Sequence, residues 1–392
     1  MRRLTNTRLP GRDAPVDVWI SGDGPDLDAG GAVVAPSFVD VSCDPGFPGF
    51  PPREGVGTLC AAALAGGFSD LLTTPAVDPV VDTPEQLARI DRVGPGGVRL
   101  LPAAALTAGL RGEELAELGL LAGAGAAALS DGGRPMRDTA VLRNALEYAR
   151  AFRVPIVLRP CDADLDRLGV MHDAPLAAVV GLRGNPSANE EIGVARVVAL
   201  VRATGTPVHL THIGSARGVA LVRAAVADGL PVTASTPARN LLLDASVLDD
   251  NRYDTRFRLH PPLRGAADRE ALVAAVREGL LCLSADHQPR APEEKELEFE
   301  RAVPGSSGLE SAFAAALTAL GDLPTVLRAL GAGPRAALGL TNVGLVLVDP
   351  EARHVVDTDA HRSRSRNDAL RGARLRGVVR SCLPDAVLVS PP

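Results

Sequence analysis

The stretch Val34-Ala35-Pro36-Ser37-Phe38-Val39-Asp40-Val41-Ser42-Cys43-Asp44-Pro45-Gly46 decides the fold of this chain. An apolar run rich in valine ends in an aspartate and is followed by a small polar cluster. Such a run is typical of a buried parallel strand that delivers polar side chains to the mouth of a barrel.

The pattern continues outward from this stretch. From about residue 37 to residue 335, short apolar runs alternate with longer amphipathic ones, which indicates repeated βα units. Residues 139–152 and 216–228 carry apolar residues at three- and four-residue spacing and are predicted to be helices. The predicted strands include residues 98–102, 126–129, 156–158, 208–210, 232–234 and 281–284. We therefore expect an α/β fold, a (β/α)8 barrel of the TIM type with its chemistry at the carboxyl ends of the strands.

The two ends of the chain contain strand-like pieces that cannot bury a core alone, such as residues 16–20 and 344–349. We expect them to pair into one small composite β-domain built from residues 1–36 and 340–392. The barrel then spans residues 37–339.

The composition excludes several classes of protein. The 392 residues carry a net charge of −6 without a basic block, which argues against nucleic acid as a partner. No apolar run approaches the roughly 18 residues of a membrane span, and the first residues lack the apolar segment of a signal peptide. Five scattered cysteines favour free thiols in a reducing compartment. We therefore expect a cytoplasmic protein without a membrane partner.

The motifs resemble those of the dihydroorotases, cyclic amidohydrolases of pyrimidine synthesis. Residues 40–49 are similar to the family run Asp-x-His-x-His-x-Arg-x-Pro-Gly. In-register similarity continues through Ser130-Asp131-Gly132-Gly133, Val208-His209-Leu210-Thr211-His212 and Ser284-Ala285-Asp286-His287. The resemblance covers some 330 residues, and it implies an amidohydrolase-type barrel.

The resemblance also implies a catalytic zinc, but the ligand positions are largely changed. Ser42, Asp44 and Arg159 stand where the family has metal-binding histidines. Asp131 and His212 keep ligand positions, and Asp286 keeps the position of the catalytic general base. A catalytic zinc takes about three protein ligands, and a guanidinium cannot ligate a cation. We therefore expect no metal, and zinc only if the protein is an active enzyme.

The substrate-binding positions are changed as well. By the resemblance, Gly46 replaces the arginine that binds the substrate carboxylate, and Ala76 replaces its asparagine partner. His260 stands for a substrate-contacting asparagine and Arg290 for a substrate-contacting histidine. Arg239 and Asn240 fall in the segment that replaces a family Pro-His-His.

The leading hypothesis is a non-catalytic dihydroorotase homologue. The resemblance implies that such proteins are oligomeric structural partners of aspartate transcarbamoylase. The first alternative is an active dihydroorotase or related zinc cyclic amidohydrolase that interconverts N-carbamoyl-aspartate and dihydroorotate at a rebuilt site. The second is binding of a small anion in the old pocket, lined by Arg159, Arg239 and Arg290.

The retained side chains also have purely structural explanations. Asp286 is expected to pair with Arg159 or Arg290 in a filled pocket, because opposite charges offset each other's desolvation. Asp131 could be a cap or a salt-bridge partner, and His212 a strand-end histidine satisfied by hydrogen bonds. A carboxylated lysine bridge is excluded at the barrel centre, since the sole lysine, Lys295, lies beyond the last catalytic strand.

Overall fold

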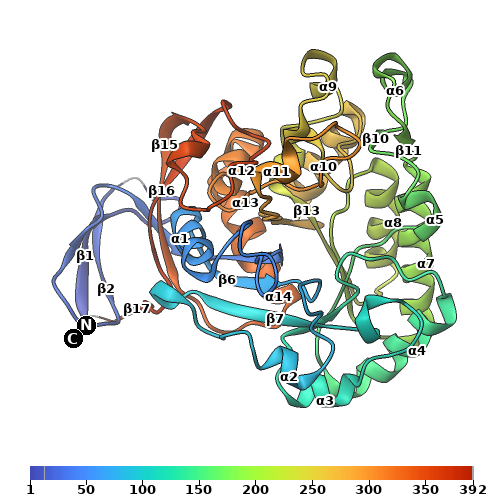
Figure 1. Ribbon diagram of the computed structural model, residues 1–392. Coiled ribbons are helices and arrows are strands. Elements are labelled where there is room, and N and C mark those ends of the chain that lie inside the picture. Colours follow the sequence, from blue (N-terminus) through green and yellow to red (C-terminus); the bar gives the residue numbers. More distant parts are fainter. Residues whose placement is uncertain (13, 391–392) are drawn as a thin grey trace.

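The barrel strands follow one another around a nearly closed sheet in the computed structural model, which describes residues 1–12 and 14–390 (Figure 1). Among these residues, eight parallel strands pair in the order β14-β13-β12-β9-β8-β7-β6-β5. The barrel strands are β5 (Phe38–Cys43), β6 (Phe68–Thr73), β7 (Arg99–Ala105), β8 (Ala128–Ser130), β9 (Ile156–Leu158), β12 (Val208–Leu210), β13 (Val232–Pro237) and β14 (Leu281–Ser284). The predicted fold class is confirmed.

Closure between the first and last strands uses few main-chain bonds. The Asp44 amide donates to the His287 carbonyl at 2.8 Å, and the Ala285 amide donates to the buried Asp40 carboxyl at 3.0 Å. The side chain of Asp40 therefore replaces part of a missing ladder between β5 and β14.

Helices cover the outside of the barrel, as βα units require. Their bounds are α1 (Val56–Gly66), α2 (Pro84–Leu87), α3 (Leu118–Gly123), α4 (Thr139–Ala149), α5 (Ala163–Asp166), α6 (Pro175–Val180), α7 (Ala188–Thr204), α8 (Ala216–Ala227), α9 (Val247–Asp250), α10 (Ala266–Glu278), α11 (Pro292–Lys295), α12 (Ala312–Leu320), α13 (Leu323–Leu327) and α14 (Gly333–Ala337). Local sequence explains where they begin: the Ser215 hydroxyl, for example, caps α8 by accepting from the Gly218 amide at 3.0 Å. No helix among the described residues is long and apolar enough to cross a membrane.

Both chain ends add strands beside the barrel. The remaining strands are β1 (Arg2–Thr7), β2 (Val16–Ile20), β3 (Leu27–Asp28), β4 (Val33–Pro36), β10 (Met171–His172), β11 (Gly184–Asn185), β15 (Leu345–Val355), β16 (Arg374–Leu383) and β17 (Leu388–Val389). The first and last parts of the chain meet twice, because β4 pairs with β15 and β17 pairs with β2. The exact boundaries of a composite domain stay a prediction.

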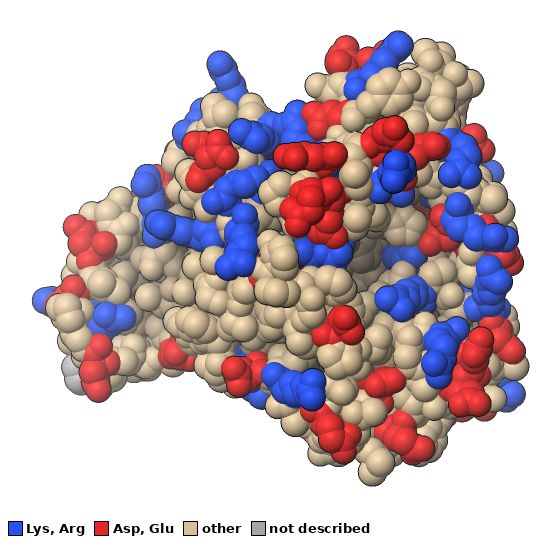
Figure 2. Space-filling view, in the orientation of Figure 1, with Lys and Arg blue, Asp and Glu red and all other residues tan. Residues whose placement is uncertain are grey.

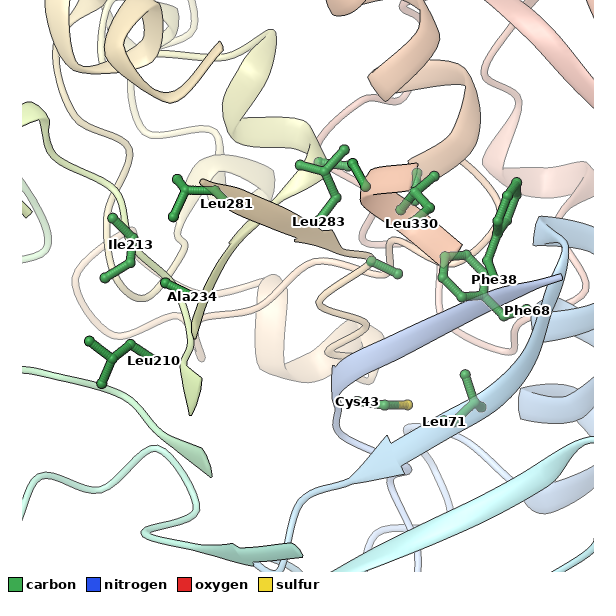
Figure 3. Close-up of a cluster of buried hydrophobic side chains, with 14 of the residues drawn as sticks. Phe38, Cys43, Phe68, Leu71, Leu210, Ile213, Ala234, Leu281, Leu283 and Leu330 are labelled. Atoms are coloured by element: carbon green, nitrogen blue, oxygen red, sulfur yellow. The ribbon is translucent and has the colours of Figure 1, made fainter. Parts of the chain in front are cut away.

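The core is built mainly from small aliphatic residues. Three of its aromatic side chains gather beside β5: Phe38 and Phe68, labelled in Figure 3, have ring centroids 5.6 Å apart, and Phe313 lies 5.6 Å from Phe38. Inside the barrel, Val41, Leu72 and neighbouring small residues fill the space, so the chemistry is confined to the strand ends.

Candidate active site

A cavity of about 390 Å³ opens at the carboxyl ends of the barrel strands. Its wall includes eight of the twelve residues predicted to form the site: Ser42, Asp44, Ala76, Asp131, Arg159, His212, His260 and Arg290. The other four do not line it: Gly46, Arg239, Asn240 and Asp286. The mouth of the barrel therefore brings together most of the predicted residues.

Asp286 follows β14 and is fully buried. Its carboxylate accepts from His212 Nε2 at 2.9 Å, from Gln288 Nε2 at 2.7 Å and from the Arg239 guanidinium. Burial acts to raise the pKa of Asp286, but the charges of His212 and Arg239 and these hydrogen bonds outweigh it and lower the pKa well below its usual range. This carboxylate is therefore ionised and fully occupied by protein partners.

Arg239 supplies the permanent charge opposite Asp286. It lies on the short 3-10 turn Ala238–Leu241 directly after β13, and its side chain is buried. Besides the carboxylate, it donates to the main-chain carbonyl of Asp286 at 3.2 Å. The expectation that Asp286 pairs with Arg159 or Arg290 is wrong. The strand order explains this for Arg159, because β13 adjoins β14 whereas β9, which precedes Arg159, lies two strands further away. Arg290 follows β14 itself but pairs with Asp44 instead.

Arg159 is buried at the end of β9 and pairs with a different acid. Its two terminal nitrogens donate to Asp166 of α5 at 3.0 and 2.7 Å, and its Nε donates to the Gly133 carbonyl at 2.8 Å. His260 Nε2 lies 3.0 Å from the same Asp166 carboxylate. Asp166 therefore organises two predicted site residues, although nothing in its local sequence singled it out.

Asp131 makes only main-chain contacts in this site. Its carboxyl accepts from the Gly133 amide at 2.8 Å and the Arg159 amide at 3.3 Å, which fits the cap interpretation and not the salt-bridge one. Burial raises the pKa of Asp131 to about 6, and the hydrogen bonds oppose this only in part. A fraction of this group is therefore protonated near neutral pH.

Two of the predicted site positions, Asp44 and Gly46, lie in the loop after β5. Asp44 pairs with Arg290 Nη1 at 2.7 Å and accepts from the Gly46 amide at 3.0 Å, as a turn residue would. Gly46 has a φ of 68°, and a Cβ placed there would lie 2.8 Å from Cβ of Glu54. An arginine at position 46 would therefore require this loop to move.

These residues do not fit a catalytic zinc. Among the predicted ligand positions, only His212 is a histidine. Its Nε2 is hydrogen-bonded to the Asp286 carboxylate, and its buried Nδ1 has no hydrogen-bond partner within residues 1–12 and 14–390. Over the same described ranges, no three His, Cys, Asp or Glu side chains are grouped so as to hold a metal ion. The Arg239 guanidinium already offsets the charge of Asp286, so a divalent cation would meet a positive neighbour.

The anion hypothesis receives partial geometric support. Arg159 and Arg290 line the cavity as predicted, but each is already ion-paired, with Asp166 and Asp44 respectively. Arg239 does not line the cavity and is ion-paired with Asp286. These pairs offset the charges of the three predicted arginines, whereas Arg134, which also lines the cavity, has no ion pair within the described residues.

Two buried acids near the site were missed from the sequence. Burial, reinforced by the charge of Asp286, raises the pKa of Asp40 to about 7. Glu54 lies 3.3 Å from His287 Nε2 and also accepts from the Ser363 hydroxyl; burial acts to raise its pKa, but these partners lower it to about 2. Asp40 could have been found from the sequence, because it lies within the motif quoted at the start. Glu54 lies outside that motif, and nothing in the sequence marked it as a site residue.

Comparisons with known proteins agree with this architecture. Residues 31–217 match the family model described as "Dihydro-orotase-like". The dihydroorotase of Anaeromyxobacter sp. (strain K) is 37% identical over 366 residues, covering 90% of this chain and 84% of that protein. The dihydroorotase of Syntrophotalea carbinolica is 36% identical over 370 residues, covering 91% and 87%.

Solved structures support the fold alone. The L-hydantoinase (dihydropyrimidinase) from Arthrobacter aurescens superposes with a TM-score of 0.82 at 18% identity, covering 98% of this chain and 94% of that one. A D-hydantoinase structure superposes with a TM-score of 0.80 at 20% identity, covering 99% and 95%. Because the curated relatives exceed 30% identity over nine-tenths of the sequence, this chain belongs to the dihydroorotase family.

Proposed function

We propose that this chain serves pyrimidine biosynthesis as a dihydroorotase-family protein that does not itself open or close the cyclic amide. The observation that carries the proposal is the buried ion pair between Asp286 and Arg239, at the position where the family has its general base. In this pair the Arg239 guanidinium binds the Asp286 carboxylate, which would have to be free to accept a proton during catalysis.

The chemistry of a general base makes this contact decisive. A general base must accept a proton during turnover, and it does so best when its pKa lies near the working pH. His212 and Arg239 hold the pKa of Asp286 well below its usual range despite burial. A proton on Asp286 would also weaken both ion pairs, so proton uptake there is opposed by the surrounding charges.

The remaining function of such a barrel would be structural. We propose that the chain binds aspartate transcarbamoylase, as the resemblance implies for members with altered sites. Two observations support this role: the chain has a well-packed barrel, and Ser42, Asp44 and Gly46 depart from the motif of active members. The proposal concerns a partner, so it is tested by binding and not by activity.

The test combines metal content, turnover and co-purification. The purified full chain would be analysed for zinc and assayed for carbamoyl-aspartate cyclisation and dihydroorotate hydrolysis in the presence of added zinc. We expect well under one zinc per chain and no turnover above background, and we expect co-expressed aspartate transcarbamoylase to co-purify. Stoichiometric zinc with turnover would refute the non-catalytic role, and absence of co-purification would refute the partner.

A second candidate is an active dihydroorotase, and a specific observation favours it. Relatives that share more than a third of their residues with this chain over nine-tenths of its length carry the name dihydroorotase. The comparisons favour this candidate over the non-catalytic one, whereas the contacts of Asp286 favour the non-catalytic one. Turnover in the wild-type chain that disappears in Asp286→Asn would establish the enzyme.

A further inference from the structure

A short segment, residues 361–367, places a row of arginines beside the mouth of the barrel. Arg362, Arg364 and Arg366 are exposed, whereas the residues between and after them, Ser363, Ser365 and Asn367, are buried. We call the three exposed side chains the arginine row.

The buried side of this segment fixes the row in place. The Ser365 hydroxyl donates to the Arg290 carbonyl at 3.0 Å and accepts from the Arg290 amide at 3.1 Å. Asn367 Nδ2 donates to the Gly305 carbonyl at 2.9 Å, and Ser363 donates to Glu54. The arginines therefore project from a rigid base.

The charge of the row is not offset within the chain. Among the described residues, none of the three arginines has an ion pair; Arg364 donates to the Pro51 carbonyl, and Arg366 to the carbonyls of Ser363 and Ser365. The nearby Glu310 accepts from the Arg362 amide at 2.8 Å. Glu54 likewise accepts from the Arg364 amide at 3.1 Å. These two carboxylates bind the main chain of the segment, so within the described residues the three guanidinium groups stay free of ion pairs.

An acidic surface lies next to this row. Glu293, Glu296, Glu298 and Glu300 are exposed on and just after α11, and we call them the glutamate ridge. In the described part of the chain, Glu293 and Glu296 have no side-chain partner; Glu298 and Glu300 make only exposed pairs at 4.0 and 3.4 Å. Lys295 does not offset the ridge, because its amine points inward to the carbonyls of Arg258 and Val303.

The row and the ridge adjoin each other. Arg290, which is bonded to Ser365 of the row segment, stands two residues before α11. Arg364 contacts Pro51, and Arg53, two residues further on, donates to Glu294 of α11 at 2.9 Å. Figure 2 shows basic side chains gathered near β15 and β16 and acidic ones gathered over α11 on the same face.

This arrangement limits the kind of partner that would fit. A nucleic acid or a uniformly acidic protein would meet the glutamate ridge as well as the row, and the ridge would repel it. A second copy related by a two-fold axis would instead place each row on the partner's ridge, since such an interface uses the same patch on both subunits. We propose that the arginine row and the glutamate ridge form a self-complementary interface between two copies of this chain.

The test is a charge exchange followed by sedimentation. The variants R362E/R364E and E293R/E296R should each be monomeric, because each brings like charges together across the axis. An equimolar mixture of the two should form a heterodimer, because the acidic row of one variant then meets the basic ridge of the other. The wild-type dimer should weaken about tenfold or more between 50 and 500 mM NaCl, because the Debye length shortens to a few ångströms.

A control variant separates surface charge from location. R143E/R202E changes two exposed, ion-paired arginines on α4 and α7, away from the row (Figure 1), and should dimerise like the wild type. A monomeric wild type at 50 mM NaCl, a salt-insensitive dimer, or a mixture that stays monomeric would overturn the proposal. Binding of poly-glutamate or a DNA duplex to the row without self-association would also overturn it.

Discussion

Replacing Arg239 by methionine tests whether the guanidinium stabilises the buried site. Methionine keeps much of the length and the apolar stem but cannot donate a hydrogen bond or carry charge. In Arg239→Met, Asp286 remains fully buried, with His212 at 2.9 Å, Gln288 at 2.7 Å and the Ser42 hydroxyl at 3.4 Å as its remaining donors. The variant therefore leaves a buried carboxylate partly uncompensated.

The size of the effect follows from these contacts. Removing one partner of a buried ion pair typically costs about 3–5 kcal/mol. Because three donors to Asp286 remain, we expect the lower end, about 3 kcal/mol. For 392 residues, an unfolding entropy of about 2.1 cal/mol/K per residue converts this into a fall in Tm of roughly 4 °C.

The assay is urea unfolding at pH 7, followed by circular dichroism, with Tm from calorimetry as a second measure. The double variant Arg239→Met/Asp286→Asn should regain about 2 kcal/mol, since it removes the uncompensated charge together with its partner. Arg353→Met, on exposed β15, is the matched control and should change stability by less than about 0.5 kcal/mol. A loss below about 1 kcal/mol in Arg239→Met, or no recovery in the double variant, would refute the reasoning.

Three further predictions concern ionisation and metal. Glu54 has a folded pKa of about 2, below its unfolded value, so its stabilisation is present above about pH 4.3 and lost as the pH falls toward 2. Glu54→Gln should therefore lose roughly 3 kcal/mol at pH 7 by urea unfolding and little at pH 2. Burial lowers the pKa of Lys295 to about 7, so its acylation, mapped by mass spectrometry, should rise with a midpoint near pH 7, not near 10. The triple variant Ser42→His/Asp44→His/Arg159→His should still bind well under one zinc per chain by elemental analysis. Zinc binding should rise only when Arg239, whose guanidinium pairs with Asp286, is replaced as well.

Much of the fold could be predicted from local pattern. The expected strands at 98–102, 156–158, 208–210 and 281–284 correspond to β7, β9, β12 and β14, and the helix expected at 216–228 is α8. These elements could be found because buried parallel strands are apolar on both faces and barrel helices are apolar on one. The ends of the predicted barrel strands shifted by three residues or fewer, whereas the piece expected at 344–349 continues to residue 355 in β15, since the pattern does not mark where pairing stops.

Which residues lie at the site could largely be predicted as well, but which of them form ion pairs with one another could not. Positions at strand ends must meet at one rim of a barrel, so Asp131, His212 and Asp286 could be placed there from motif position alone. Which arginine meets Asp286 depends on the order of strands around the barrel, and Arg239 is 47 residues away in sequence. Asp166 and Glu54 lie on segments outside the strands, where no periodicity fixes the direction of a side chain.

The changes at this site are coupled through one carboxylate. Asp286 needs a positive neighbour because it is ionised and fully buried, and either a divalent cation or a guanidinium can supply that charge. The two exclude each other, because both would have to reach the same oxygens and their charges repel at short range. The Arg239 contact therefore stabilises a barrel whose Ser42 and Asp44 no longer provide imidazoles, and it opposes the return of a metal. Placing histidines at these positions alone leaves that opposition in place, because Arg239 already compensates the single buried charge that a metal would compensate.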